Sequence, residues 1–382
     1  MPQEYRENSV ANNPEIKFLD RCGAPVFIDF FENGNSPHVS IAGVSGSGKT
    51  SLMKYIIKSY LSGGAKGWII DIGRSYENFV HTNGGQFIDF RKNTPICINP
   101  FSLIKNIDVD IRFLVPWLAS IAKSGSHEAH TSLEYALLEK AIRSCYAEHR
   151  ELTTITHIQK YLIREASECC EKEVATPMSK KMMPFCQGGI YADFFNGPNT
   201  LSINTNLVAI ELEDLKNAPE LLQAVLLILI YRATQEMYLS QTIKKIVVLD
   251  DIFSYYLGNQ IESATCIEEC YRLARLYAGA FMAGTQCISD YFRHEASSAI
   301  YANAGWKLFL RQNNKTVKDI NLGPTLEQMI LSLESGQKEF SEMVVYSSTR
   351  MELVRFPIEP YSNKPDNYNV AINRVVGSGM SF

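Results

Sequence analysis

Apolar positions follow two different periods along the chain. Residues 207–212, 246–249 and 280–284 are short, nearly continuous apolar runs, whereas residues 220–238 and 262–277 carry apolar positions at helical spacing. Further strand-like runs lie at residues 25–30, 38–42, 68–72, 86–98 and 307–310, and a further helical stretch lies at 51–61. Strands that are apolar on both faces are typical of a sheet covered by helices on both sides. The pattern predicts an α/β fold with a mainly parallel sheet flanked by helices.

Residues 108–186 have a different pattern. Apolar residues recur at helical spacing, as in Leu133, Ala136 and Leu137, and β-branched runs are almost absent. A capping-box pattern from Thr156 to Gln159 predicts a further helix start. We predict an all-α insertion that divides the α/β domain into residues 25–107 and 187–358. The polar residues 1–24 are predicted to form an irregular arm, and residues 359–382, rich in Pro, Asn and Ser, a peripheral tail.

Composition narrows the class of protein. The 382 residues are 46% hydrophobic and 20% charged, with a net charge of −4, which disfavours a generally basic nucleic-acid binder but allows a local basic groove. Nine scattered cysteines indicate reduced thiols. No charged-then-apolar leader opens the sequence, and the most apolar run, residues 221–230, is half the length that spans a bilayer. These features predict a cytoplasmic protein with no direct membrane span.

The strongest motif is a glycine-rich loop. Residues 43–50, GVSGSGKT, match G-x-x-x-x-G-K-[ST] and lie between a predicted strand and a predicted helix. Such a loop curls its N–H groups around phosphate oxygens, while Lys49 reaches the β- and γ-phosphates and the Thr50 hydroxyl ligates Mg²⁺. We expect Lys49 to lie in a solvent-facing loop. The predicted nucleotide-binding residues are Gly43, Ser45, Gly46, Ser47, Gly48, Lys49, Thr50 and Ser51.

A phosphate-binding loop requires acidic partners at the end of another strand. Asp250 and Asp251 follow the apolar run 246–249, so Asp250 is the predicted metal-side carboxylate and Asp251 the group that polarises the attacking water. Tandem acids also form ordinary turns, and the upstream loop favours the catalytic interpretation. Gln286, at the tip of the next strand, is predicted to sense the γ-phosphate or to position water; the alternative is an ordinary polar strand end.

Several further segments together resemble the ATPase core of the TraC family, the VirB4-like ATPases of conjugative type IV secretion systems, which are related to HerA/FtsK motor proteins. The resemblance spans residues 24–346 and is carried by segments 70–76, 84–90, 98–101, 189–191, 195–198, 211–215, 223–225, 303–307 and 341–342. It implies a RecA-like P-loop fold, ATP and Mg²⁺ as cofactors, ATP hydrolysis and a hexameric ring. It also implies docking to secretion-channel components at the inner membrane.

The resemblance assigns further roles and shows two departures. In the ring, an arginine of a neighbouring subunit stabilises the transferring phosphate, and Arg275 and Arg272 are the candidates, although both could be solvated surface residues. Family members usually have Asp-Glu where this chain has Asp250-Asp251, and the shorter carboxylate is expected to affect rate more than binding. Relatives carry a large N-terminal domain, so we expect this chain to be the C-terminal part of a longer protein.

These observations favour an ATP-hydrolysing motor module that powers pilus assembly or the transfer of protein or DNA. Two alternatives remain open at the level of sequence. One is a DNA-translocating ATPase of the HerA/FtsK type, and the other is a nucleotide-binding assembly component with weak hydrolysis.

Overall fold

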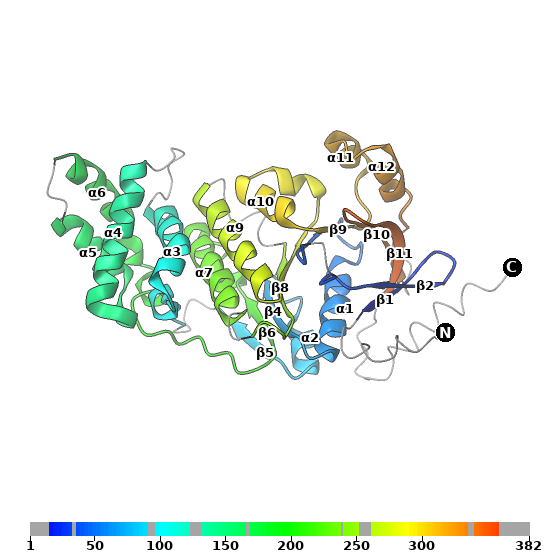
Figure 1. Cartoon of the computed structure of the whole chain (residues 1–382), viewed down its shortest axis with the longest axis horizontal. Coiled ribbons are helices and arrows are strands. Elements are labelled where there is room, and N and C mark those ends of the chain that lie inside the picture. The colour runs from blue at the N-terminus through cyan, green and yellow to red at the C-terminus, as the bar shows by residue number, and fades with distance from the viewer. Residues whose placement is uncertain are drawn as a thin grey trace, which may run out of the picture.

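The computed structural model describes residues 15–32, 36–90, 96–122, 131–165, 169–237, 240–251, 261–334 and 340–358. Its centre is an 11-stranded sheet in the order β2-β1-β11-β10-β9-β3-β8-β7-β4-β6-β5. Figure 1 shows helices α4, α5 and α6 at one end of the molecule and strands β1, β2 and β11 at the other.

The strands from β9 to β5 in this order run parallel. They are β3 (Val39–Ala42), β4 (Lys66–Asp71), β5 (Gln86–Asp89), β6 (Leu207–Glu211), β7 (Lys245–Asp250), β8 (Gly279–Thr285) and β9 (Trp306–Phe309). Asp71 pairs with Glu211, and Asp250 pairs with Gly284. The carboxyl ends of these strands therefore lie at one edge of the sheet, which we call the carboxyl edge. The opposite edge is the amino edge.

Antiparallel strands extend the sheet beyond β9. They are β10 (Phe340–Tyr346), β11 (Met351–Pro357), β1 (Ile16–Leu19) and β2 (Pro25–Ile28). The predicted irregular arm over residues 1–24 is wrong for β1, where Ile16 and Phe18 are buried. Four residues are too few for a two-residue period to stand out, and β1 depends on pairing with β2 and β11.

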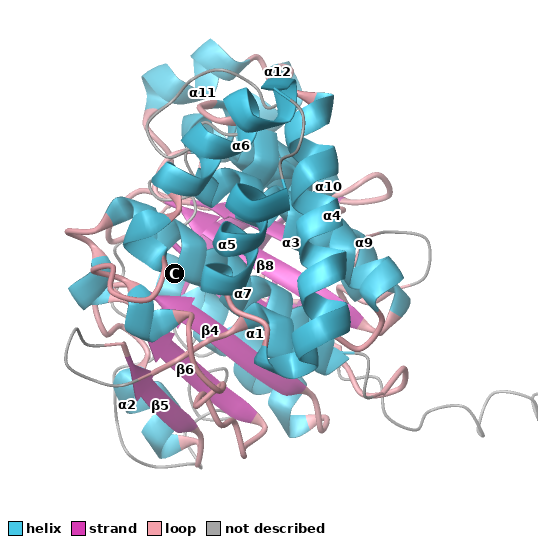
Figure 2. Ribbon diagram, turned by 90° about the vertical axis from the view of Figure 1, so that its left-hand side faces the viewer, coloured by secondary structure: helices cyan, strands magenta, loops and turns pink. Residues whose placement is uncertain are grey.

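Helices cover both faces of the parallel strands, and Figure 2 shows α7 on the side of the sheet that is turned toward the viewer. On one face, α1 (Lys49–Ser62) and α2 (Glu77–Thr82) share a core with Ile246 and Val248 of β7. On the other face, α7 (Pro219–Met237), α9 (Ile261–Leu276) and α10 (Glu295–Asn303) share a core with Val247 and Leu249. Successive residues of β7 thus enter opposite cores. This confirms the predicted fold class and explains the continuous apolar runs.

The predicted insertion contains helices and no strand among its described residues. The helices are α3 (Ile107–Ala122), α4 (Ser132–His149), α5 (Ile155–Glu165) and α6 (Cys169–Lys181). Helix α3 packs against α7 and α9 as well as α4. The helix predicted near Thr156 exists, but its start is different. Thr154 Oγ1 accepts from the His157 N–H at 3.3 Å, whereas Thr156 Oγ1 donates to Asn196 Oδ1 at 2.7 Å.

The remaining elements are short. Helices α11 (Asn314–Ile320) and α12 (Pro324–Leu331) precede β10. Short 3₁₀ helices lie at Pro100–Leu103, Arg150–Leu152, Met183–Phe185, Ala192–Phe194, Glu213–Leu215 and Ile288–Phe292. The strand predicted over 86–98 ends at Asp89 in the structure, and part of that range lies outside the described residues. Among the described helices, none combines the length and the apolar character needed to cross a membrane.

Candidate nucleotide site

The glycine-rich loop joins β3 to α1 at the carboxyl edge. Gly46 and Gly48 have φ angles of 77° and 93°, a backbone region that L side chains rarely adopt. A Cβ on Gly48 would also come within 3.2 Å of Phe356. Gly48 precedes α1, and no side chain caps this helix start. The first N–H groups of α1 therefore point out of the helix toward the loop, as required for binding a phosphate.

Strands β8 and β10 and the segment after β9 hold the loop from outside. The Gly43 N–H donates to the Thr285 carbonyl and the Val44 N–H to the Arg311 carbonyl, each at 3.0 Å. The Ser341 hydroxyl of β10 donates to the Ser47 carbonyl at 2.7 Å. The antiparallel part of the sheet thus positions the loop directly. Ser341 belongs to one of the resembling segments, but its role follows only from this contact.

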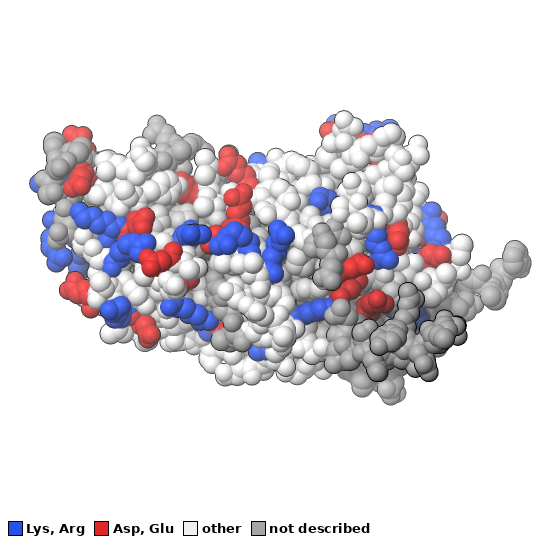
Figure 3. Space-filling model, viewed as in Figure 1, with Lys and Arg blue, Asp and Glu red and all other residues white. Residues whose placement is uncertain are grey.

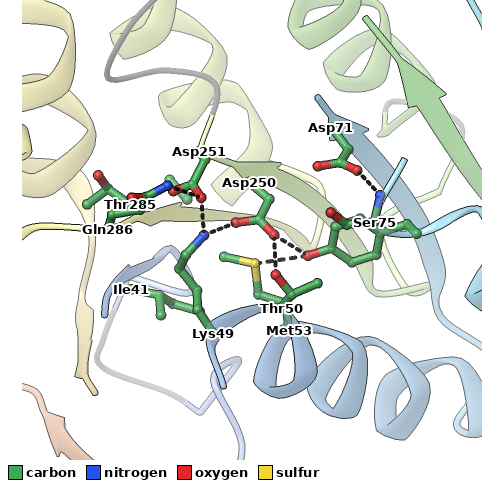
Figure 4. Close-up of polar contacts among 12 residues, drawn as sticks. Ile41, Lys49, Thr50, Met53, Asp71, Ser75, Asp250, Asp251, Thr285 and Gln286 are labelled. Atoms are coloured by element: carbon green, nitrogen blue, oxygen red, sulfur yellow. Dashed lines mark hydrogen bonds and ion pairs between the residues drawn. The ribbon is translucent and has the colours of Figure 1, made fainter. Parts of the chain in front are cut away.

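Lys49 is the first residue of α1 and is buried, with only 7% of its surface exposed. The prediction of a solvent-facing lysine is therefore wrong. Its Nζ contacts Asp250 Oδ1 and lies 2.8 Å from Asp251 Oδ2 (Figure 4). Burial acts to lower the pKa of Lys49, but the two carboxylates outweigh it and leave that pKa above its ordinary value. In the structure, these carboxylates form ion pairs with the ammonium group, whereas the motif assigns that group to phosphate binding.

Asp250 ends β7 and is almost fully buried. Thr50 Oγ1 donates to its Oδ2 at 3.0 Å, so the two predicted metal-side residues are in contact. The Tyr76 phenol also donates to Oδ2, at 2.9 Å, and sequence reasoning assigned no role to this residue. The signal that could have found it is its place in segment 70–76, close behind a strand that ends at the same edge.

Asp251 follows β7 with a φ of 55°, in the left-handed region. Its N–H donates to the Gly284 carbonyl at 2.9 Å. Gln286 Nε2 donates to Asp251 Oδ2 at 3.3 Å, whereas the buried Asp251 Oδ1 has no hydrogen-bond partner among the described residues. Burial raises the pKa of Asp251, and Lys49 opposes this rise. The structure therefore brings together the predicted water-polarising acid and the predicted sensor amide, as Figure 4 shows.

The residues at this edge fit Mg²⁺. Two carboxylates face a single ammonium group, and the Thr50 hydroxyl lies beside Asp250. Within the part of the chain that the structure describes, one oxygen of Asp251 has no partner. Carboxylate and hydroxyl oxygens are the hard ligands that Mg²⁺ prefers, and this ion is usually held by one or two carboxylates together with substrate phosphates.

Two further acids, missed as site residues, end the neighbouring strands. Asp71 accepts from the Ser75 N–H at 2.7 Å, and Glu211 accepts from the N–H groups of Gly73 and Arg74. Burial, together with the charges of Asp250 and Glu211, raises the pKa of Asp71 to about 7. Each acid directly follows an apolar run, which is the same signal that identified Asp250.

The two candidate arginines lie away from this site within one chain. Both are exposed near the end of α9, and the next strand, β8, begins at Gly279 on the amino edge. Arg272 pairs with Glu269 of its own helix at 2.6 Å. Arg275 lies near enough to His38, just before β3, for its charge to lower the pKa of that histidine. Neither arginine contacts Lys49 or Asp250 in this chain, so a role there needs a second subunit.

The fold and the site together define a P-loop nucleotide-binding domain of the RecA-like class. Residues 15–354 match the family described as the TraG P-loop domain, and the chain belongs to that family. A curated relative is Protein TraC of Escherichia coli (strain K12), which is 28% identical over 313 residues, covering 77% of this chain and 35% of that protein. The chain thus spans about a third of that relative's length.

Solved structures share the fold. VirB4 of Thermoanaerobacter pseudethanolicus superposes with a TM-score of 0.73 at 18% identity, covering 92% of this chain and 98% of that one. The plasmid coupling protein TrwB in complex with ADP and Mg²⁺ gives a TM-score of 0.62 at 14% identity, covering 92% of this chain and 91% of that one. These likenesses confirm the predicted RecA-like fold. The match to the TraG P-loop domain shows the family, and the similarity to TraC agrees with the predicted resemblance.

Proposed function

We propose that this chain is the ATP-hydrolysing motor module of a conjugative type IV secretion system, acting on ATP with Mg²⁺. The observation that carries the proposal is the contact of Lys49 with both Asp250 and Asp251 at the start of an uncapped helix. A buried lysine with two acids is rarely needed for packing alone, and here it lies at the end of a phosphate-binding loop. The similarity to TraC supports the system in which the motor works.

Each residue has a definite task in this proposal. Lys49 and the loop N–H groups bind the phosphates and hold negative charge as it develops. Thr50 and Asp250 would hold Mg²⁺, which neutralises phosphate charge when it is bound. Asp251 orients a water molecule and takes its proton, and Gln286 keeps the Asp251 carboxylate in place.

The ring and its partners belong to the same proposal. We assign Arg275 to the site of a neighbouring subunit in a hexamer, because it lies at the edge opposite its own chain's loop. Secretion-channel components at the inner membrane are the expected docking partners, and pilus subunits, other proteins or DNA are the expected substrates. The chain would act in the cytoplasm and attach to the membrane through this complex.

Steady-state hydrolysis of ATP tests the proposal. The rate should depend on Mg²⁺, rise with protein concentration as rings form, and not require DNA. On the face drawn in Figure 3, basic and acidic side chains are interspersed over the described residues rather than forming one basic surface. Strong stimulation by DNA would instead support a DNA-translocating ATPase. Tight ATP binding without turnover at any concentration would support an assembly component.

A further inference from the structure

Residues 71–76, from the last residue of β4 to the residue before α2, form a turn beside the nucleotide site. Gly73 and Arg74 have φ angles of 112° and 58°, so two successive residues occupy the left-handed region. Asp71 and Glu211 hold the turn by accepting from its backbone N–H groups. The Arg74 side chain anchors the outer side through Asp89 at 2.8 Å and Glu77 at 3.0 Å. Such strain persists only where the surroundings enforce it, and it is common at functional sites.

The turn places Tyr76 against the metal-side carboxylate. Tyr76 is fully buried, and its phenol oxygen lies 2.9 Å from Asp250 Oδ2 and 3.2 Å from Met53 Sδ. A phenol has one proton, and a carboxylate is a much stronger acceptor than a thioether, so the phenol donates to Asp250. Met53 and the ammonium group of Lys54, which lies 5.2 Å from the ring centroid, enclose the ring from α1.

Among the described residues, Asp250 has two further side-chain contacts, and both come from residues that bind other ligands in the proposed function. Lys49 contacts Oδ1, and Thr50 donates to Oδ2. In the proposed function, Lys49 serves the phosphates and Thr50 serves Mg²⁺. The Tyr76 phenol is assigned to neither, and it belongs to the turn before α2 rather than to α1. It is thus the contact that can hold Asp250 while Lys49 and Thr50 bind their ligands.

We propose that Tyr76 is a positioning residue, which holds the Asp250 carboxylate in its metal-facing orientation. This inference rests on the proposed function. It gives segment 70–76 a physical role: Asp71 and Glu211 fix the turn, the turn fixes Tyr76, and Tyr76 fixes Asp250. The role concerns Mg²⁺ rather than the nucleotide itself.

Tyr76→Phe tests the proposal because it removes one hydroxyl and keeps the ring. Tyr60→Phe is the matched control: Tyr60 is also buried, and its phenol donates to Asp29 Oδ1 at 2.8 Å, remote from the loop. Binding of a fluorescent ADP analogue is measured with Mg²⁺ and with EDTA, together with kcat and KM. For Tyr76→Phe we expect unchanged affinity in EDTA and about a ten-fold smaller gain in affinity from Mg²⁺. We also expect kcat to fall about ten-fold with little change in KM. Tyr60→Phe should keep parental values.

A second measurement separates positioning from a general loss of structure. If Tyr76 acts through the charged Asp250 carboxylate, Tyr76→Phe should have no further effect on the Mg²⁺-dependent gain in the Asp250→Asn background. An equal loss in both backgrounds, or a parental Mg²⁺ gain in Tyr76→Phe alone, would overturn the positioning role. If Lys49→Ala abolishes binding while Tyr76→Phe is parental, only the positioning role fails. If the parental chain shows no Mg²⁺-dependent nucleotide binding, the proposed function fails as well.

Discussion

Two lysine–aspartate sites, each with a buried aspartate, lie at opposite edges of the parallel sheet, and they differ in how fully their charges and hydrogen bonds are matched. At the amino edge, Lys244 Nζ lies 2.9 Å from Asp29 Oδ2, and Asp29 Oδ1 also accepts from the Tyr60 phenol and the Phe31 N–H. The ammonium group lies 5.0 Å from the centroid of the Phe31 ring. One positive charge meets one negative charge, and the hydrogen-bonding groups are satisfied.

At the carboxyl edge, one ammonium meets two carboxylates. Lys49 contacts Asp250 and Asp251, and Asp251 has a left-handed backbone. No described residue is a hydrogen-bond partner of one oxygen of Asp251. Burial and ion pairing are therefore common to both sites and do not reveal function. What separates them is unbalanced charge and an unsatisfied oxygen, which a stable interior avoids unless a ligand completes the site.

Replacing each lysine by alanine should show the difference between the two sites most clearly. Lys49→Ala should abolish nucleotide binding and hydrolysis, because it removes the cation that meets the phosphates. Lys244→Ala should leave both intact and lower the free energy of unfolding by about 3 kcal/mol, because Asp29 is left buried without a countercharge. Titration with a fluorescent nucleotide and thermal unfolding measure the two effects. Parental ATP affinity in Lys49→Ala would contradict the assignment of the loop.

Arg275→Ala should lower the rate of hydrolysis by about 10³ to 10⁵ while sparing ATP binding, because an arginine from a neighbour stabilises the transition state. Such a loss would show that Arg275, at the amino edge of one subunit, acts at the nucleotide site on the carboxyl edge of the next subunit. Arg272→Ala is the control, since Arg272 pairs with Glu269 in its own helix. Mixing Arg275→Ala with Lys49→Ala subunits should restore activity, because some interfaces regain both residues. A concentration-independent rate together with a silent Arg275→Ala would refute the trans role.

Asp251→Asn should lower the rate by about 10²-fold without weakening nucleotide binding, because it keeps the shape but removes the proton acceptor. Asn also tolerates the left-handed backbone at this position. Asp251→Glu should keep or raise the rate, since it restores the reach usual in the family. Single-turnover hydrolysis measures both variants. If Asp251→Asn turns over at the parental rate, another residue positions the water, and Gln286 is the next candidate.

A change of pH should alter the free energy of unfolding through one group at each edge, and the two contributions have opposite signs. The pKa of Asp71 is about 7 in the folded chain and near 3.8 when unfolded. Between these values the unfolded chain loses a proton that the folded chain keeps, so stability falls as pH rises, by up to about 1.4 kcal/mol per pH unit. At the amino edge, burial lowers the pKa of His38 to about 3, so stability falls as pH drops below 6.5.

Asp71→Asn isolates the first effect, because the amide oxygen can still accept from the Ser75 N–H. Relative to the parent, the variant should gain stability between pH 5 and pH 8, as measured by urea unfolding without nucleotide. The free energies of unfolding of variant and parent can also differ by the same amount at pH 5 and at pH 8. That result would show that Asp71 is ionised throughout this range.

The sequence alone determined the parallel sheet, the covering helices, the loop at residues 43–50 and the pair Asp250-Asp251. These features are local. Because each central strand is buried on both faces, its residues form an apolar run that can be read without knowing its neighbours. A loop that binds phosphate through its backbone likewise needs a contiguous motif.

Only the tertiary structure decided how the antiparallel strands join the sheet, because β1 pairs with β11, more than 300 residues away in the chain. It also decided that Lys49 is buried, that Tyr76 and Asp71 stand beside Asp250, and that Arg275 lies at the opposite edge. Strand order determines which carboxyl ends become neighbours, and the charges that meet there set burial and pKa. Strand order arises from long-range pairing, which no local pattern of apolar and polar residues records.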